Sequence, residues 1–260
     1  MGEPLIDPDK GSHIFVTGRK GQGKSILCRH LFDSFPYDRV CIDPTGDVRA
    51  DMRRQASPFT ELTDPLPVRL PVDPDGQPQA FVYVPDPGAP EYLDNIDRAV
   101  GLAMLHGKTC LWVDEVGEVT RAGVTPPNFR RALHHGRHRQ LTLLLAGPRP
   151  IDVNPLCVSQ ADHVFIFHLP NPADGKRVAE NIGWPPREFE KAVHNLGDHE
   201  FLWWSTKAQE LTHLPALAIA SPAAQAATHR DRRNNEAKNG EINKSGTVDN
   251  ASNPTPSIVS

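Results

Sequence analysis

The sequence predicts an α/β fold in which a mainly parallel β-sheet is covered by helices on both faces. Two observations point to this class. Short apolar runs that suit buried strands alternate with stretches in which apolar residues recur at helical spacing, a pattern typical of parallel sheets with helical crossovers. The chain also has 260 residues, enough to bury a substantial core. Its net charge of −4 gives no global attraction to nucleic acid, so such contact requires a local basic patch or a pore built by several subunits.

Residues 12–35 hold the most informative motif of the chain. The apolar run 14–16 predicts a buried strand, and the spacing of Ile26, Leu27 and Leu31 predicts a helix after it. Between the two lies a segment that matches the phosphate-loop pattern G-x-x-x-x-G-K-[ST] at every fixed position. This candidate nucleotide site consists of Gly18, Arg19, Lys20, Gly21, Gln22, Gly23, Lys24 and Ser25.

The residue types of this loop suit ATP and Mg²⁺. Glycines allow the backbone to wrap closely, so that successive N–H groups and the helix N-terminus cradle a triphosphate. The Lys24 ammonium is expected to reach the β- and γ-phosphates, and the Ser25 hydroxyl to bind Mg²⁺. The alternative, an ordinary glycine-rich turn, explains neither the flanking strand nor the helix.

The next part of the chain is less regular. Residues 39–43 predict a second strand, which ends in a turn-rich segment up to Asp47. Residues 58–90 are rich in proline, which excludes long helices and favours an irregular excursion with one short strand at 81–84. Residues 91–105 have the apolar spacing of a helix.

Residues 110–115 read as a buried strand that ends in two carboxylates, Asp114 and Glu115. At the carboxyl end of a parallel strand, both side chains would emerge beside the phosphate loop. Asp114 is expected to hold Mg²⁺ through water, and Glu115 to orient and deprotonate an attacking water. Such a pair favours hydrolysis of ATP over transfer of its phosphate to a small molecule. The alternative is that the two carboxylates only begin a solvated loop.

The remaining elements complete one domain, residues 1–220. From residue 221 onward large apolar side chains are scarce, which predicts a disordered tail, 221–260. The expected elements are a helix opened by Pro126 and Pro127, strands at 141–146, 163–169 and 200–205, and helices at 173–182 and 188–196.

Residues 130–139 form the most basic stretch of the chain, with four arginines and three histidines. Three interpretations remain open: a solvated helix end with a basic turn, an arginine that reaches the γ-phosphate of a neighbouring subunit, and a contact with DNA phosphates. A zinc site built from His134, His135 and His138 is the least favoured, because no cysteine or distant fourth ligand accompanies them.

Cysteine usage and hydropathy bear on location. The four cysteines are widely spaced and two lie inside apolar runs, which indicates a reduced, cytoplasmic protein. The sequence has no signal peptide and no apolar run of about 18 residues, so we expect no membrane segment of its own.

The order of motifs resembles the FtsK–HerA superfamily of DNA-pumping ATPases over about residues 12–205. It is similar in size to the genome-packaging ATPases of tailless, membrane-containing viruses. The motifs that carry the resemblance are the phosphate loop, Asp43-Pro44-Thr45-Gly46, Asp114-Glu115, Gly136-Arg137-His138, Arg149-Pro150, Gln160-Ala161-Asp162 and Glu200-Phe201-Leu202-Trp203.

The resemblance implies a RecA-like P-loop NTPase core, a ring that is usually hexameric, and ATP-driven movement of DNA through its pore. For a viral protein it also implies a capsid or membrane-associated partner and association with the virion. By position, Lys24 and Ser25 match the Walker A ligands, and Asp114 and Glu115 the Walker B pair. Arg137, with Arg139 as the second candidate, lies near the family's trans-acting arginine.

One position departs from the family pattern. In the family, the strand after the Walker B strand commonly ends in a polar sensor, often glutamine, but here it ends Leu145-Ala146-Gly147-Pro148. Two alternatives follow: coupling between the γ-phosphate and DNA runs through Arg149, or it is weaker than in the family. Three alternative functions remain: a zonula-occludens-toxin-like phage assembly ATPase, a nucleotide-dependent switch or scaffold, and, least favoured, a small-molecule kinase.

Overall fold

A computed structural model describes residues 7–120 and 124–217 of the chain. By its internal contacts the chain divides into two units, residues 1–217 and residues 218–260. The tail that the composition predicts from residue 221 onward lies outside the described residues.

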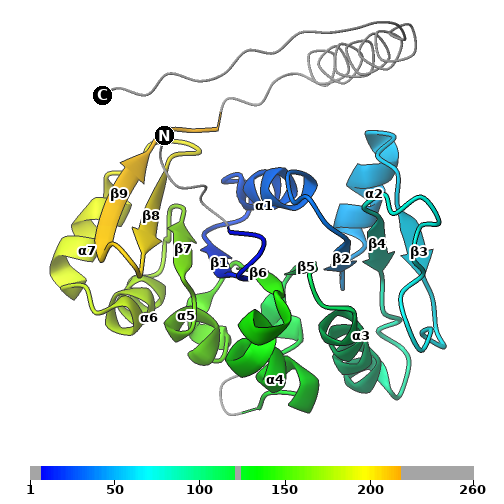
Figure 1. Ribbon diagram of the computed structural model, residues 1–260. Helices are drawn as coiled ribbons and strands as arrows, with labels where there is room; N and C mark the ends of the chain where they lie inside the picture. The colour runs from blue at the N-terminus through cyan, green and yellow to red at the C-terminus, as the bar shows by residue number, and fades with distance from the viewer. Residues whose placement is uncertain (1–6, 121–123, 218–260) are drawn as a thin grey trace, which may run out of the picture. The chain divides into compact units, whose positions relative to one another are not determined.

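Nine strands form a single sheet in the order β3-β4-β2-β5-β6-β1-β7-β8-β9. The seven strands from β3 to β7 pair in parallel, and β8 and β9 pair antiparallel at one edge. In Figure 1, α1 and α2 cover one face of the sheet, while α3, α4, α5 and α6 cover the other. The predicted fold class, a mainly parallel sheet with helices on both faces, is therefore confirmed.

The strands are β1 (His13–Thr17), β2 (Arg39–Ile42), β3 (Thr60–Leu62), β4 (Ala80–Tyr83), β5 (Cys110–Val113), β6 (Thr142–Gly147), β7 (His163–Ile166), β8 (Phe201–Ser205) and β9 (Glu210–Leu214). The α-helices are α1 (Lys24–Asp33), α2 (Asp47–Arg54), α3 (Tyr92–His106), α4 (Pro127–His135), α5 (Leu156–Ser159), α6 (Pro172–Ile182) and α7 (Pro186–His194). The short 3₁₀ helices are η1 (Val116–Glu118), η2 (Gly136–Arg139) and η3 (Pro150–Asp152).

Alternation along each central strand builds two cores. In β1, Phe15 packs into the core beneath α3 and α4, whereas Ile14 and Val16 pack into the core beneath α1. Successive strand residues point to opposite faces, so a strand covered on both sides is buried throughout, as all five residues of β1 are. This explains the short apolar runs at the centre of the predicted strands, such as residues 14–16 of β1.

Three elements were not expected from the sequence. The proline-rich segment contributes two strands, β3 and β4, to the sheet edge instead of one. The turn-rich segment after β2 continues into α2, of which only Val48 and Met52 are buried. Strand β9 follows β8, and its mostly polar, half-exposed residues give no strand signal.

None of the described helices is long and apolar enough to cross a membrane. All four cysteines are buried and unpaired, and burial raises the pKa of each thiol.

The amino ends of the strands are held together around His13. The imidazole Nε2–H donates to the Leu133 carbonyl at 3.0 Å, and the backbone N–H of His13 donates to the Asp162 carboxylate at 2.7 Å. Burial lowers the pKa of the His13 imidazole to about 4, and the neighbouring Arg137 guanidinium acts in the same direction. The folded chain therefore holds this histidine neutral.

We expect His13 to make the fold acid-sensitive. In the unfolded chain His13 titrates near pH 6.5, but in the folded chain only near pH 4. As the pH falls from 6.5 to 4, proton binding therefore favours the unfolded chain. The free energy of unfolding falls by about 3 kcal/mol over this range. His13→Gln, whose amide can still donate to Leu133 and does not titrate, should show a flatter profile. Urea unfolding of both proteins at several pH values measures this, and parallel profiles would contradict it.

Candidate nucleotide site

The phosphate loop connects β1 to α1 and is shaped by its glycines. Gly18 has a φ of 144°, and a Cβ placed there would lie 2.4 Å from the Cβ of Phe167. Gly23 has a φ of 104° and is the N-cap of α1. Residues other than glycine rarely adopt these backbone φ values, and at Gly18 the contact with Phe167 leaves no room for a side chain. The fixed glycines of the motif are thus required by the backbone conformation.

The motif lysine is mostly buried beneath this loop. Lys24 is 9% exposed, and its Nζ donates to the Arg19 carbonyl at 3.3 Å. Burial lowers the pKa of the Lys24 ammonium, while the nearby Glu115 carboxylate opposes that change. A cation held by one backbone carbonyl can exchange it for phosphate oxygens. Of the other predicted ligands, Gln22 is buried, whereas Ser25, Arg19 and Lys20 are exposed.

The two predicted carboxylates follow β5 and lie on the carboxyl edge of the sheet, as the phosphate loop does. Strand β6 separates β5 from β1 in the sheet order. Burial raises the pKa of the Asp114 carboxyl to about 7, and the charges of Glu115 and Asp43 add to this, while Lys24 opposes it. Burial also raises the pKa of Glu115, again opposed by Lys24. The charges of Lys24, Asp114 and Glu115 therefore act on one another.

Glu115 has an unusual backbone. Its φ of 49° and ψ of 54° place it in the left-handed region, immediately before η1. For a residue with a Cβ this conformation is uncommon and costs roughly 1–3 kcal/mol. The turn directs the chain sharply away from β5, at the position where the sequence predicts the catalytic carboxylate.

A magnesium ion suits the oxygen donors present here. The described residues contain no group of three or more histidine, cysteine or acidic side chains that could hold a metal by themselves. Mg²⁺ commonly binds one or two protein oxygens together with substrate phosphates and water. Ser25 would supply a protein oxygen and Asp114 would hold the ion through water, so the ion would arrive with the nucleotide.

Asp43, at the end of β2, is a buried acid whose part in this site the sequence interpretation missed. Its side chain is fully buried and accepts hydrogen bonds from the backbone N–H groups of Gly46 and Arg49, at 2.9 and 2.8 Å. It thereby caps α2 and adds negative charge near Asp114. The turn sequence after β2 was the available signal, because an acid before a glycine is typical of such caps.

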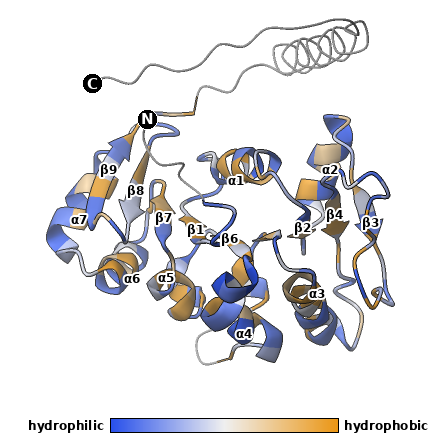
Figure 2. Cartoon of the chain, in the orientation of Figure 1, coloured by the Kyte–Doolittle hydropathy of each residue, from blue (hydrophilic) through white to orange (hydrophobic). Residues whose placement is uncertain are grey.

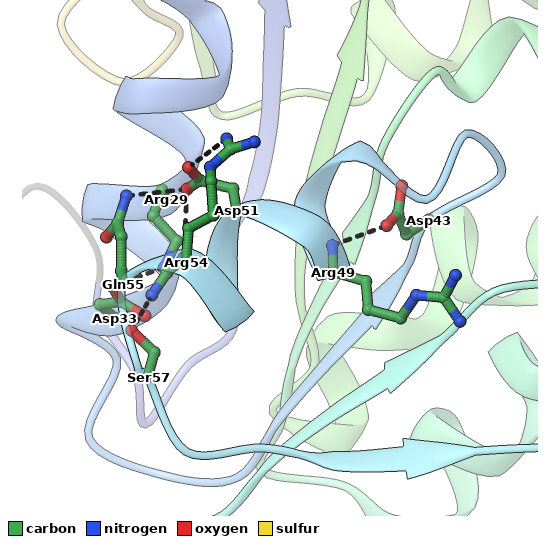
Figure 3. Close-up of polar contacts among 8 residues, drawn as sticks. All are labelled: Arg29, Asp33, Asp43, Arg49, Asp51, Arg54, Gln55 and Ser57. Carbon is green, nitrogen blue, oxygen red and sulfur yellow. Dashed lines mark hydrogen bonds and ion pairs between the residues drawn. The ribbon is translucent and has the colours of Figure 1, made fainter.

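Helix α1 is tied to α2 by a mostly buried guanidinium. Arg29 forms ion pairs with Asp33 on its own helix and with Asp51 on α2, and donates to the Ser57 hydroxyl. Figure 3 shows this group beside the Asp43 cap. Helix α2 therefore connects the phosphate-loop helix to the strand that carries Asp43.

A histidine far along the chain lies against the phosphate loop. The Nδ1 of His199 is 3.7 Å from the position of a Cβ on Gly23. His199 is exposed and has a φ of 64°. The following Glu200 carboxylate accepts from the Gly197 N–H and lies 2.9 Å from His213 Nε2. No local sequence pattern indicates this contact, because it depends on the long-range approach of the α7–β8 loop to the phosphate loop.

The basic turn η2 lies at the amino ends of the parallel strands, opposite their carboxyl ends, where the phosphate loop lies. It precedes β6, whereas the phosphate loop follows β1, and a five-residue strand separates the two edges by roughly 15 Å. The Arg137 guanidinium is held within its own chain, by the Asp162 carboxylate at 3.0 Å and the Gln160 carbonyl at 2.6 Å. Arg139 is exposed, and its side chain has no ion pair or hydrogen bond with the described residues.

Arg149 lies on the carboxyl edge, beyond the end of β6. Its guanidinium pairs with Asp152 at 3.4 Å and approaches the buried Asp174 of α6 at 3.9 Å. A residue that replaces the family's sensor would have to exchange these carboxylates for nucleotide phosphate. Whether it does so stays a prediction.

Taken together, the sheet order, the phosphate loop and the acidic turn after β5 define a P-loop NTPase fold. Comparison with solved structures agrees. The genome packaging NTPase B204 from Sulfolobus turreted icosahedral virus 2, solved in complex with AMPPCP, is similar with a TM-score of 0.62 and 20% identity over 82% of this chain and 100% of that one. VirB4 of Thermoanaerobacter pseudethanolicus is similar with a TM-score of 0.61 and 11% identity, over 84% and 94% of the two chains.

The fold thus resembles that of a viral genome-packaging ATPase and of VirB4, in agreement with the fold class that the motifs predicted. No family model matches the sequence. A curated relative, protein 088R of Invertebrate iridescent virus 3, is 28% identical over 181 residues, which are 68% of this chain and 61% of the relative. The match therefore spans less than two thirds of the relative's length.

Proposed function

We propose that this chain is an ATPase that forms a ring and uses ATP hydrolysis to move DNA, in the manner of a viral genome-packaging motor. The observation that carries the proposal is the convergence of Lys24, Asp114 and Glu115 on one edge of the sheet, beside a phosphate loop whose glycines are required. The similarity in fold to a packaging NTPase solved with an ATP analogue supports it. Packaging would bring the chain to a capsid or membrane-associated viral protein.

Each residue of the site has a role in this proposal. The loop from Gly18 to Ser25 binds the phosphates, with Lys24 on the β- and γ-phosphates. Ser25 and, through water, Asp114 would hold Mg²⁺, which would neutralise phosphate charge. Glu115 takes a proton from the attacking water, and its raised pKa brings this carboxylate closer to the range in which a general base is effective.

The experiment that tests the function compares ATP hydrolysis by the full chain with and without double-stranded DNA. A motor should hydrolyse ATP in both cases and faster with DNA. A nucleotide-dependent switch would bind ATP, but DNA would not stimulate its ATP hydrolysis. Absence of hydrolysis under all conditions would refute the proposed ATPase.

We also expect His199 to contribute to nucleotide binding. Its ring lies against Gly23, it is exposed, and it can donate a hydrogen bond to a bound nucleotide. Loss of one hydrogen bond of about 0.5–1.5 kcal/mol corresponds to a KM for ATP raised about 2- to 12-fold. His199→Ala should show this with an unchanged kcat. His194→Ala, an exposed histidine at the end of α7, is the matched control. Equal KM values for both variants would remove His199 from the site.

A further inference from the structure

The exposed side of α4 is uniformly basic. Arg130, Arg131, His134, His135 and His138 recur at helical spacing, and all five are exposed. We call these five residues the α4 basic face. The His135 and His138 rings stack with their centroids 6.3 Å apart, so the face continues from α4 into η2. In Figure 2 the helix is coloured predominantly hydrophilic.

The other side of α4 fixes this face in place. Phe129, Ala132 and Leu133 are buried in the core. The Asp97 carboxylate of α3 accepts from the backbone N–H groups of Asn128 and Phe129, at 3.1 and 2.9 Å. The helix is therefore anchored at its N-terminus and along its apolar side, and the basic side chains project from a rigid element.

The arginines of this face lack the carboxylate partners found elsewhere. Neither Arg130 nor Arg131 has an ion pair or hydrogen bond with another described side chain. Among the other described arginines, six pair with acids: Arg29, Arg49, Arg53, Arg54, Arg137 and Arg149. Those without an ion pair, such as Arg69, Arg177 and Arg187, lie apart from one another in the sequence, so the α4 basic face is distinguished by two unpaired arginines on one helix. In a chain with a net charge of −4, two adjacent unpaired arginines on one helix produce a local positive potential that attracts a polyanion.

We propose that the α4 basic face binds the sugar–phosphate backbone of duplex DNA. The inference rests on the proposed function, since it identifies where the moved DNA is held. Guanidinium groups form paired hydrogen bonds with phosphate oxygens. Arginines can also read guanine in the major groove, but contacts with phosphates carry no sequence information, so binding to the backbone alone predicts equal affinity for duplexes of unrelated sequence.

The face is distinct from the nucleotide site. Helix α4 packs on the sheet surface opposite α1, the phosphate-loop helix (Figure 1), and none of its five residues takes part in the proposed chemistry. Loss of the face should therefore reduce DNA binding and leave ATP hydrolysis without DNA unchanged.

The test is a double substitution in the full chain, Arg130→Gln with Arg131→Gln. The matched control is Arg187→Gln with Lys191→Gln, which also removes two exposed charges from one helix, α7, where Glu188 and Glu190 are exposed too. The affinity for a labelled DNA duplex is measured at several salt concentrations, together with ATP hydrolysis without DNA. A second variant, His134→Ala with His135→Ala, tests the face without altering its arginines.

The arginine variant should bind duplex at least about 10-fold more weakly, and its slope of log K against log salt should be shallower by about 2. Two duplexes of unrelated sequence should behave alike, and the histidine variant should also bind more weakly. Wild-type affinity and slope in the arginine variant, or an equal loss in the control, would overturn the inference. So would a changed oligomeric state with unchanged DNA affinity, which would assign the face to a subunit contact. The proposed function fails separately, if the wild-type chain does not hydrolyse ATP.

Discussion

Glu115→Gln should bind ATP with wild-type affinity and hydrolyse it roughly 10²–10⁴ times more slowly, the range that a positioned general base contributes. The amide keeps the size and polarity of the side chain but cannot accept the proton of the attacking water. Single-turnover hydrolysis and equilibrium binding of ATP, measured on the same protein, separate the two effects. Hydrolysis at the wild-type rate would show that Glu115 is not the base.

Two controls sharpen this prediction. Glu118→Gln changes an exposed acid three residues further on, in η1, and should leave hydrolysis near the wild-type rate. Lys24→Ala removes the cation that meets the β- and γ-phosphates, so it should lose ATP binding itself. The three variants together distinguish loss of chemistry from loss of binding and from a general change of local charge.

A trans-acting arginine should have an effect of similar or larger size. Of the other cations near the site, Arg19 and Lys20 are exposed and Arg149 is paired with Asp152, whereas an arginine supplied from outside to stabilise charge on the γ-phosphate contributes roughly 10³–10⁵ in rate. The turn at 137–139 lies at the amino ends of the parallel strands, away from the phosphate loop of its own chain. An arginine there could instead reach the nucleotide of a neighbouring subunit in a ring. Arg137 is held by Asp162 within its own chain, whereas Arg139 is exposed. We therefore propose Arg139 as the arginine that reaches the γ-phosphate bound by the neighbouring subunit.

Arg139→Ala should therefore bind ATP normally and hydrolyse it slowly. Mixing it with Lys24→Ala subunits should restore part of the activity, because some interfaces then combine an intact phosphate loop with an intact arginine. Arg137→Ala is the comparison. If Arg137 is structural, the substitution should lower the thermal midpoint; if Arg137 is the trans-acting arginine, the variant should fold normally and have a lower kcat. Mixed rings of confirmed mass without recovered activity would count against any arginine in trans.

Much of the site could be predicted from the sequence because its signals are local. The phosphate loop and the Asp114-Glu115 pair each follow an apolar strand, and the spacing of their residues is set by a single turn of chain. Helix α2 and strand β9 were missed because they bury few apolar residues, so their patterns resemble those of loops. The contact of His199 with Gly23 and the ion pair of Arg137 with Asp162 join segments distant in sequence, which no local pattern encodes.

The buried guanidinium of α1 has a mechanical consequence. Arg29 links α1 to Asp51 of α2, and two arginines of α2, Arg49 and Arg53, pair with Glu61 of the edge strand β3. A displacement of α1 must either break these ion pairs or carry α2 and β3 with it. The proline-rich edge strand β3 is thereby connected to the phosphate-loop helix through two sets of ion pairs, although the two segments are distant in the sheet order.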